Sequence, residues 1–250
     1  MPDRTLLLLA DIGGYTEFMR LHRLNLAHSQ EITRRLLESM LDAAPALRLV
    51  EVEGDALFLA APQDAPEESE GSSGWLSTAL AMYQAFHAKQ QWMLAHNLCV
   101  CDACRRIGSL QVKFVAHIGD VVPQRIRDTE KLVGVDVIAV HRMLKNPVPV
   151  PEYVLMSEPL HQHLEPQLRD RAVRVEQDLE GLGRMPLYFV ELGDLPIELP
   201  AVPEPTLAAR VRETVGLGLR AFPQVIGLRR GTWRRPPAPI EAPSPARGDE

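Results

Sequence analysis

The chain has 250 residues and a formal net charge of -6, with 46% hydrophobic and 24% charged residues. These values are ordinary for a globular protein, and the length allows one large core with little left for a second. The negative charge argues against a general nucleic-acid binder, which would present a basic surface. No apolar stretch approaches the roughly 20 residues of a membrane span. We therefore expect a cytoplasmic protein with no transmembrane segment.

The first predicted element is a short apolar strand over residues 6–10, which leads into Asp11 and a pair of glycines. It lacks the basic start and the cleavage pattern of a signal peptide. Apolar residues at helical spacing then predict a helix over 17–41. Residues 46–61 predict two strands joined by a Gly-Asp turn that contains Asp55. Two aspartates thus follow strands beside glycine turns, a pattern typical of sites for divalent metals and phosphates.

The rest of the chain continues with helices and strands. The predicted elements are an acidic, mobile loop over 62–74, a helix over 75–98, a strand over 110–118, a helix over 133–144, strands over 172–175 and 186–192, and an amphipathic helix over 206–222. The order β-α-β-β-α-β predicts an α+β fold of the ferredoxin-like kind, an antiparallel sheet with helices on one face. A change in composition predicts a first domain over 1–195 and a C-terminal region over 196–250 with a disordered end.

All three cysteines lie close together, and a histidine stands three residues before the first. An odd number at such short spacing is a poor disulfide framework and fits a reducing compartment. Because zinc favours four nitrogen or sulfur ligands in a tetrahedron, His96, Cys99, Cys101 and Cys104 predict a structural Zn²⁺ site. The alternatives are a fourth ligand from His117 or from a partner chain's thiolate, free thiols at a helix end, and a redox role.

Four segments in order resemble a class III nucleotidyl cyclase domain, above all the bacterial cyclase-like proteins of the DUF2652 type: LLLADIGGYTEF, VEVEGDALFLA, VKFVAHIGDVV and GLGRMPLYFVEL. The resemblance covers about the first 190 residues. It implies metal-assisted attack of a ribose 3′ hydroxyl on the α-phosphate of a nucleoside triphosphate. It also implies a head-to-tail homodimer, in which one chain supplies the metal ligands and the other the base-reading residues and an arginine.

The resemblance implies a role for the first two motifs. Asp11 and Asp55 match the aspartates that hold two Mg²⁺ or Mn²⁺ ions. The phosphate-binding turn matches the backbone of Ile12, Gly13, Gly14, Tyr15 and Thr16. A helix-capping aspartate and a hairpin aspartate are the plainer interpretations of the two carboxylates.

The later motifs match the family less closely. Arg142 matches the arginine that stabilises the phosphate in the transition state. Ile138 replaces an asparagine that orients the ribose, and Leu182 replaces a phosphate-binding lysine. Arg184, two residues further on, is a candidate substitute for that lysine. Each lost polar contact of this kind costs on the order of 10²–10³ in rate.

The positions that read the base match Glu51 and Lys131, which reverse the lysine and aspartate of adenylyl cyclases. A carboxylate accepts from the N1 and N2 hydrogens of guanine, and a lysine donates to its O6. The resemblance therefore implies a cyclase that favours GTP over ATP. An ion pair between the two residues, or two solvated charges, is the alternative. A degenerate cyclase fold that binds a nucleotide without converting it is the alternative function.

Overall fold

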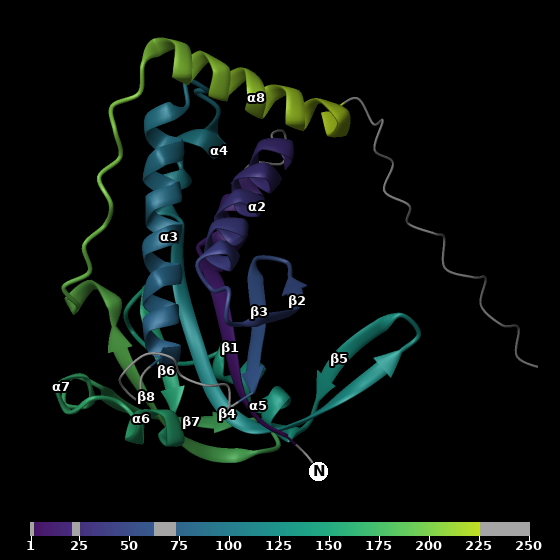
Figure 1. The fold of residues 1–250 in the computed structure, drawn as a ribbon, viewed down its shortest axis with the longest axis vertical. Coiled ribbons are helices and arrows are strands. Elements are labelled where there is room, and N and C mark those ends of the chain that lie inside the picture. The colour runs from purple at the N-terminus through teal and green to yellow at the C-terminus, as the bar shows by residue number, and fades with distance from the viewer. Residues whose placement is uncertain (1–2, 22–25, 63–73, 226–250) are drawn as a thin grey trace, which may run out of the picture.

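The structure is a computed structural model, and it describes residues 3–21, 26–62 and 74–225 (Figure 1). Most of the expected loop over 62–74 and the expected disordered end lie outside these residues. The strands are β1 (Asp3–Gly13), β2 (Arg48–Glu53), β3 (Ala56–Pro62), β4 (Gln111–Ile126), β5 (Thr129–Val133), β6 (Tyr153–Ser157), β7 (Val173–Leu179) and β8 (Gly183–Glu191). The longer helices are α1 (Tyr15–Leu21), α2 (Leu26–Asp42), α3 (Gly74–His96), α5 (Val135–Met143) and α8 (Leu207–Val225). The short ones are α4 (Asp102–Arg105), α6 (Glu158–Gln162) and α7 (Pro166–Arg169).

The strands form one sheet in the order β2-β3-β1-β4-β6-β8-β7, and β5 pairs with β4 outside this path. Every pairing is antiparallel except the parallel pair β4–β6. Strand β1 is central, because Leu7 faces Ala60 of β3 on one side and His117 of β4 on the other. The α+β class and the mostly antiparallel sheet predicted from the sequence are confirmed.

Both faces of β1 are covered, which explains its unbroken apolar sequence. Successive side chains of a strand point to opposite faces. Leu8 and Ala10 belong to the core beneath α2 and α3, whereas Leu7 and Leu9 pack in a second core with α5. The sequence predicted helices on one face only. The structure differs because α5 covers the opposite face of the sheet.

Several elements differ from the prediction. The helix predicted over 17–41 consists of α1, which ends at Leu21, and α2, which begins at Leu26. Strand β6 was not predicted, since it is a five-residue strand after a proline-rich stretch. Strand β4 continues to Ile126 and forms with β5 a hairpin that projects from the body of the protein (Figure 1).

Helix α8 follows an extended stretch and crosses the ends of α2 and α3 (Figure 1). Its contacts with these helices include an ion pair between Arg35 and Glu213. Within the described ranges, no helix combines the length and the apolar character that crossing a membrane requires.

Candidate nucleotide and metal site

Asp11 and Asp55 lie at the same end of two neighbouring strands. Asp11 of β1 pairs with Ala56 of β3, and Asp55 directly precedes Ala56 in the chain. The backbone N–H of Ile12 donates to the carbonyl of Asp55 at 3.2 Å. Gly54 precedes Asp55 with φ +70°, a left-handed conformation that glycine adopts without strain. The tight turn between β2 and β3 therefore places the second aspartate beside the first.

The electrostatics of this pair favour a cation. Burial, together with the negative charge of Asp11, raises the pKa of Asp55 to about 6, although Lys113 acts in the opposite direction. Nζ of Lys113 lies 3.1 Å from Oδ2 of Asp11, and both side chains are largely buried. One ammonium thus faces two carboxylates. Hard oxygen ligands with uncompensated negative charge suit Mg²⁺ or Mn²⁺, so these residues fit the metal that the resemblance implies.

Lys113 is a site residue that the sequence analysis missed. It lies on β4 directly opposite Asp11 of β1 in the strand register. The period-2 alternation of β4, with Val112 and Phe114 buried, marks Lys113 as a polar residue inside an otherwise apolar strand. That signal is present in the sequence, but only the register shows which aspartate it faces.

The turn after β1 is built around Gly14. Its φ is +79°, and its carbonyl accepts from the N–H of Phe18 at 3.0 Å, which opens α1. Gly14 and Thr16 are exposed, whereas Ile12 is buried beneath the turn. Burial, and secondarily the charge of Asp55, raises the pKa of the Tyr15 phenol. The predicted phosphate-binding turn therefore lies beside the two aspartates with part of its backbone accessible.

The two residues predicted to read the base lie together. Nζ of Lys131 on β5 donates to both carboxylate oxygens of Glu51 on β2, at 2.9 and 3.0 Å. Both side chains are about half exposed, at 46% for Lys131 and 41% for Glu51. The pair thus presents a donor and an acceptor side by side at an accessible surface.

The residues of the later motifs gather near α5 and the turn between β7 and β8. A methyl group placed on Gly181 of this turn would lie 3.4 Å from Nη1 of Arg142. Leu182 is partly buried against the core that α5 covers, and Arg184 is exposed at the start of β8. Ile138 is 47% exposed on α5. The two positions that depart from the family pattern therefore differ in burial: Ile138 lies on the surface, whereas Leu182 packs against the core.

The structure places the three cysteines together with a histidine that the sequence analysis did not consider. The sulfur atoms of Cys99, Cys101 and Cys104 and a ring nitrogen of His28 of α2 all lie within 4.8 Å of one another. His96, the predicted ligand, is directed elsewhere. It ends α3, and its Nδ1 donates to the carbonyl of Trp92 at 2.9 Å while its ring stacks on that indole.

His117, the alternative fourth ligand, is also directed elsewhere, since its Nε2 donates to Oδ1 of Asp136 at 3.0 Å. Burial raises the pKa of the Cys101 and Cys104 thiols and lowers the pKa of His28. In the absence of a metal the two thiols are therefore protonated at neutral pH, which argues against a redox nucleophile.

Comparisons with known proteins agree on the fold. A guanylate cyclase domain of RhGC from Catenaria anguillulae, solved in complex with GTP, matches with a TM-score of 0.55 and 17% identity, over 75% of this chain and 96% of that domain. The adenylyl cyclase CyaB from P. aeruginosa matches with a TM-score of 0.50 and 13% identity, over 82% and 98%. These likenesses show that the chain has the fold of a class III cyclase domain.

Sequence comparisons place the chain more closely. The model of DUF2652, described as a protein of unknown function, matches residues 33–153. The uncharacterised protein Rv2561/Rv2562 of Mycobacterium tuberculosis is 35% identical over 200 residues, which are 78% of this chain and 90% of that protein. The chain therefore belongs to the DUF2652 family.

Proposed function

We propose that this protein is a metal-dependent nucleotidyl cyclase that converts a nucleoside triphosphate, GTP in preference to ATP, to a cyclic nucleotide and pyrophosphate. The observation that carries the proposal is the placement of Asp11 and Asp55 side by side, next to the glycine turn at Gly14. The raised pKa of Asp55 supports it. Two carboxylates this close repel each other, and such strongly shifted pairs are found above all at functional sites.

Each group has a role in this proposal. Asp11 and Asp55 would hold Mg²⁺ or Mn²⁺, which when bound would activate the ribose hydroxyl and stabilise the leaving pyrophosphate. The exposed backbone at the Gly14 turn would donate to phosphate oxygens. Glu51 would accept from the guanine N1 and N2 hydrogens, and Lys131 would donate to O6. Both residues are free to do so only after their mutual ion pair opens.

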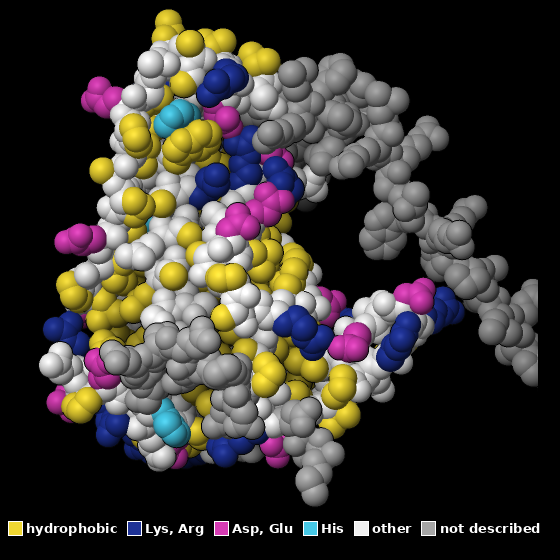
Figure 2. All heavy atoms as spheres, viewed as in Figure 1, with side chains coloured by type: hydrophobic (Ala, Val, Ile, Leu, Met, Phe, Trp, Pro, Cys, Tyr) yellow, Lys and Arg dark blue, Asp and Glu magenta, His cyan; other side chains and the backbone are white. Residues whose placement is uncertain are grey.

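Arg142 would act on the α-phosphate bound by a second copy of the chain. A fixed guanidinium aimed at a phosphate oxygen stabilises the charge that develops in the transition state. We include a homodimer in the proposal because the hairpin of β4 and β5 projects from the body and carries basic and acidic side chains along its length (Figure 2). It also exposes apolar side chains, with Val122 at 51% and Ile126 at 57%. Exposed apolar groups on a projecting arm favour a partner surface.

The proposal is tested by incubating the purified protein with ATP, GTP, CTP and UTP in turn, with Mn²⁺, and identifying products by mass spectrometry. We expect cyclic GMP as the main product and its loss in both Asp11→Ala and Asp55→Ala. Asp170→Ala is the matched control, because Asp170 is exposed in the turn before β7. If no nucleotide is converted, or if the Asp11→Ala variant is as active as the wild type, the proposal fails.

A second candidate function is nucleotide binding without turnover. Ile138 is the observation that favours it, because an exposed apolar side chain stands where the family places a polar contact to the ribose. A binding-only protein would be stabilised by GTP at 100 times its dissociation constant by about 2.7 kcal/mol. Such stabilisation with no product from any of the four nucleotides would support this function over the first.

A further inference from the structure

Four side chains that can ligate a metal, from two distant parts of the sequence, meet at the segment that follows α3. His28 belongs to α2, whereas Cys99, Cys101 and Cys104 lie 71–76 residues later, in and around α4. Nδ1 of His28 lies 3.4 Å from Sγ of Cys101, 3.8 Å from that of Cys99 and 3.9 Å from that of Cys104. All three cysteines are free, and Cys104 is buried.

These separations are those of a tetrahedral zinc site. With Zn–S bonds of about 2.3 Å and Zn–N bonds of about 2.0–2.1 Å, a nitrogen and a sulfur ligand stand roughly 3.6 Å apart. The three observed N···S distances bracket this value, and all four ligand atoms lie within 4.8 Å of one another. A single ion at the centre would thus reach every ligand with small side-chain adjustments.

The backbone around the cysteines holds the thiols toward one point. The N–H of Cys99 donates to Oδ1 of Asn97 at 2.8 Å, which fixes the start of the segment. The carbonyl of Cys101 accepts from the N–H of Arg105 at 3.1 Å, so Cys101 and Cys104 stand at the beginning and within the single turn of α4. The helical turn of α4 therefore sets the spacing between the thiols of Cys101 and Cys104.

We propose that His28, Cys99, Cys101 and Cys104 bind one structural Zn²⁺ ion. Three thiolates and a neutral imidazole are soft and borderline ligands, which favour zinc over the Mg²⁺ or Mn²⁺ of the proposed nucleotide site. Four protein ligands leave no position open for water or substrate, which is the mark of a structural site rather than a catalytic one. The proposal does not depend on the function proposed above.

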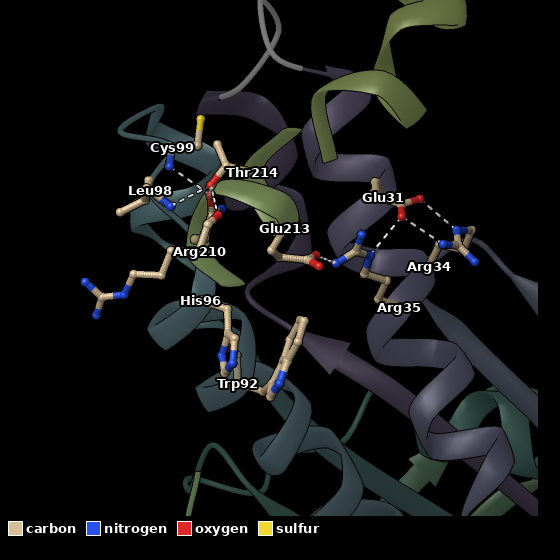
Figure 3. A network of polar contacts seen from close by, with 11 residues as sticks. Glu31, Arg34, Arg35, Trp92, His96, Leu98, Cys99, Arg210, Glu213 and Thr214 are labelled. Atoms are coloured by element: carbon tan, nitrogen blue, oxygen red, sulfur yellow. Dashed lines mark hydrogen bonds and ion pairs between the residues drawn. The ribbon is translucent and has the colours of Figure 1, made fainter. Parts of the chain in front are cut away.

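Figure 3 shows the polar contacts by which α8 rests on α2 and on the segment after α3, and the ion would hold that segment in place. The N–H of Leu98, beside the first cysteine, donates to Oγ1 of Thr214 at 2.9 Å. Nε of Arg210 donates to the carbonyl of Ala95 at 3.1 Å. On the other side Arg35 of α2 pairs with Glu213. Because zinc would tie α2 to the segment after α3, it would hold the two supports of α8 at a fixed separation.

The test measures metal in the full-length protein, purified without a histidine tag from cells grown with added zinc. Mass spectrometry of the elements should find about one zinc per chain after dialysis. Replacement by Co²⁺ should produce the visible and near-ultraviolet absorption of a tetrahedral cobalt–thiolate site. Release of zinc by a thiol-modifying reagent should accompany the reaction of three cysteines, as the three-thiolate site requires.

Variants identify the ligands. His28→Ala and Cys101→Ser should each lower the zinc content at least tenfold. His96→Ala is the matched control and should keep its zinc, because the His96 ring stacks on Trp92 outside the cluster. Removal of zinc by a chelator should also speed proteolytic cleavage within α8. If the thiols bind no metal, the chelator should leave the rate of cleavage unchanged.

The proposal is overturned if the wild-type protein holds no zinc, if it holds a stoichiometric ion of another element, or if His96→Ala loses zinc while His28→Ala retains it. Should the ligand variants fail to fold, the zinc content and the cobalt spectrum of the wild-type protein decide the question.

Discussion

Asp55 bears a charge that the folded protein disfavours when no metal is bound. Its pKa, 3.8 in an unperturbed chain, is raised to about 6 by burial and by Asp11. The group therefore stabilises the fold fully only below about pH 4, and this contribution is lost as the pH rises through about 6. At neutral pH the metal-free protein is destabilised by an ionised Asp55. A bound divalent cation would remove this penalty.

Replacing Asp55 by asparagine should therefore stabilise the metal-free protein at about pH 7. Two pKa units correspond to about 2.7 kcal/mol, and partial exposure reduces the expected gain to about 1 kcal/mol in the free energy of unfolding. Urea denaturation with a chelator present measures it. The difference from the wild type should vanish below about pH 3, where Asp55 is protonated in both states.

Asp170→Asn, on the exposed turn before β7, is the control and should leave the unfolding free energy unchanged at both pH values. Added Mn²⁺ should reverse the order, since only the wild type keeps both carboxylates. A variant Asp55→Asn that is less stable than the wild type at both pH values would contradict this account.

The pair Glu51 and Lys131 yields a prediction about base choice. Exchanging the charges by Glu51→Lys with Lys131→Asp keeps the ion pair seen in the structure but reverses donor and acceptor. We expect the preference for GTP over ATP to fall at least tenfold and to shift toward ATP, because guanine then meets unmatched groups. Competition kinetics with both nucleotides measures the ratio. An unchanged ratio, with turnover intact, would show that the pair is a surface ion pair only.

Single residues were predictable where the signal was local. Asp11 and Asp55 stand out because strand ends and glycine turns are short-range features. Lys113 was missed since its relation to Asp11 exists only in the register between β1 and β4. His28 was missed because 71 residues separate it from the first cysteine, and spacing rules search near the cysteines. In both cases a contact between distant segments completes the group.

At the scale of elements, the junction between β4 and α5 has no room for a side chain at Gly119. Oδ2 of Asp136 accepts from the N–H of Asp120 at 2.7 Å, and Oδ1 accepts from His117. A methyl group on Gly119 would lie 2.2 Å from Cβ and Cγ of Asp136. No side chain fits there while Asp136 keeps both hydrogen bonds. The first turn of α5, which also carries Ile138, is thereby fixed to the sheet.

Gly119→Ala should lower the free energy of unfolding by about 2–4 kcal/mol, through overpacking and loss of the Asp136 hydrogen bonds. Thermal and urea unfolding measure the loss. Gly108→Ala is the matched control, since its added methyl group would meet only the Leu94 side chain at an ordinary 3.5 Å. Gly119→Ala combined with Asp136→Ala should cost less than the sum of the two single changes. Additive costs would show that the two residues do not conflict.

The long helix α3 was predicted well, whereas short strands and strands outside the core were not. The helix predicted over 75–98 corresponds to α3 (Gly74–His96), whose buried residues recur along one side. Strand β6 has only five residues, and all are buried, so it shows no alternation. The hairpin of β4 and β5 continues beyond the core and carries mostly exposed residues, so hydrophobic pattern could not reveal it. Pairing between strands, which sequence pattern does not report, defines these elements.

At the scale of the whole molecule, the boundary between the cyclase-like domain over 1–195 and the C-terminal region remains a proposal. Helix α8 contacts α2 and α3 through the pair Arg35–Glu213 and through the hydrogen bond of Leu98 to Thr214. Arg35 also has a second partner, because its Nε donates to Glu31 at 2.8 Å. The domain should therefore survive without α8, with its buried arginine still paired.

A chain that ends at residue 200 should fold cooperatively, with a free energy of unfolding lower by about 1–3 kcal/mol and a Tm lower by a few degrees. Differential scanning calorimetry measures both. Glu213→Gln in the full chain is the control and should account for only part of the loss, since it leaves α8 in place. A truncated chain that does not fold would place α8 within the domain.

The central position of β1 has a consequence for synthesis of the protein on the ribosome. β1 is made before its two neighbours, and its pairing with β3 needs only the next 50 or so residues, as Leu7 meets Ala60. The other edge of β1 stays unpaired until β4 is made, because Leu7 also pairs with His117 of β4. Until β4 and α5 emerge, an apolar strand has one open edge and one uncovered face, the situation in which nascent chains associate wrongly. The order of translation thus leaves β1 prone to wrong association until its second neighbour has been made.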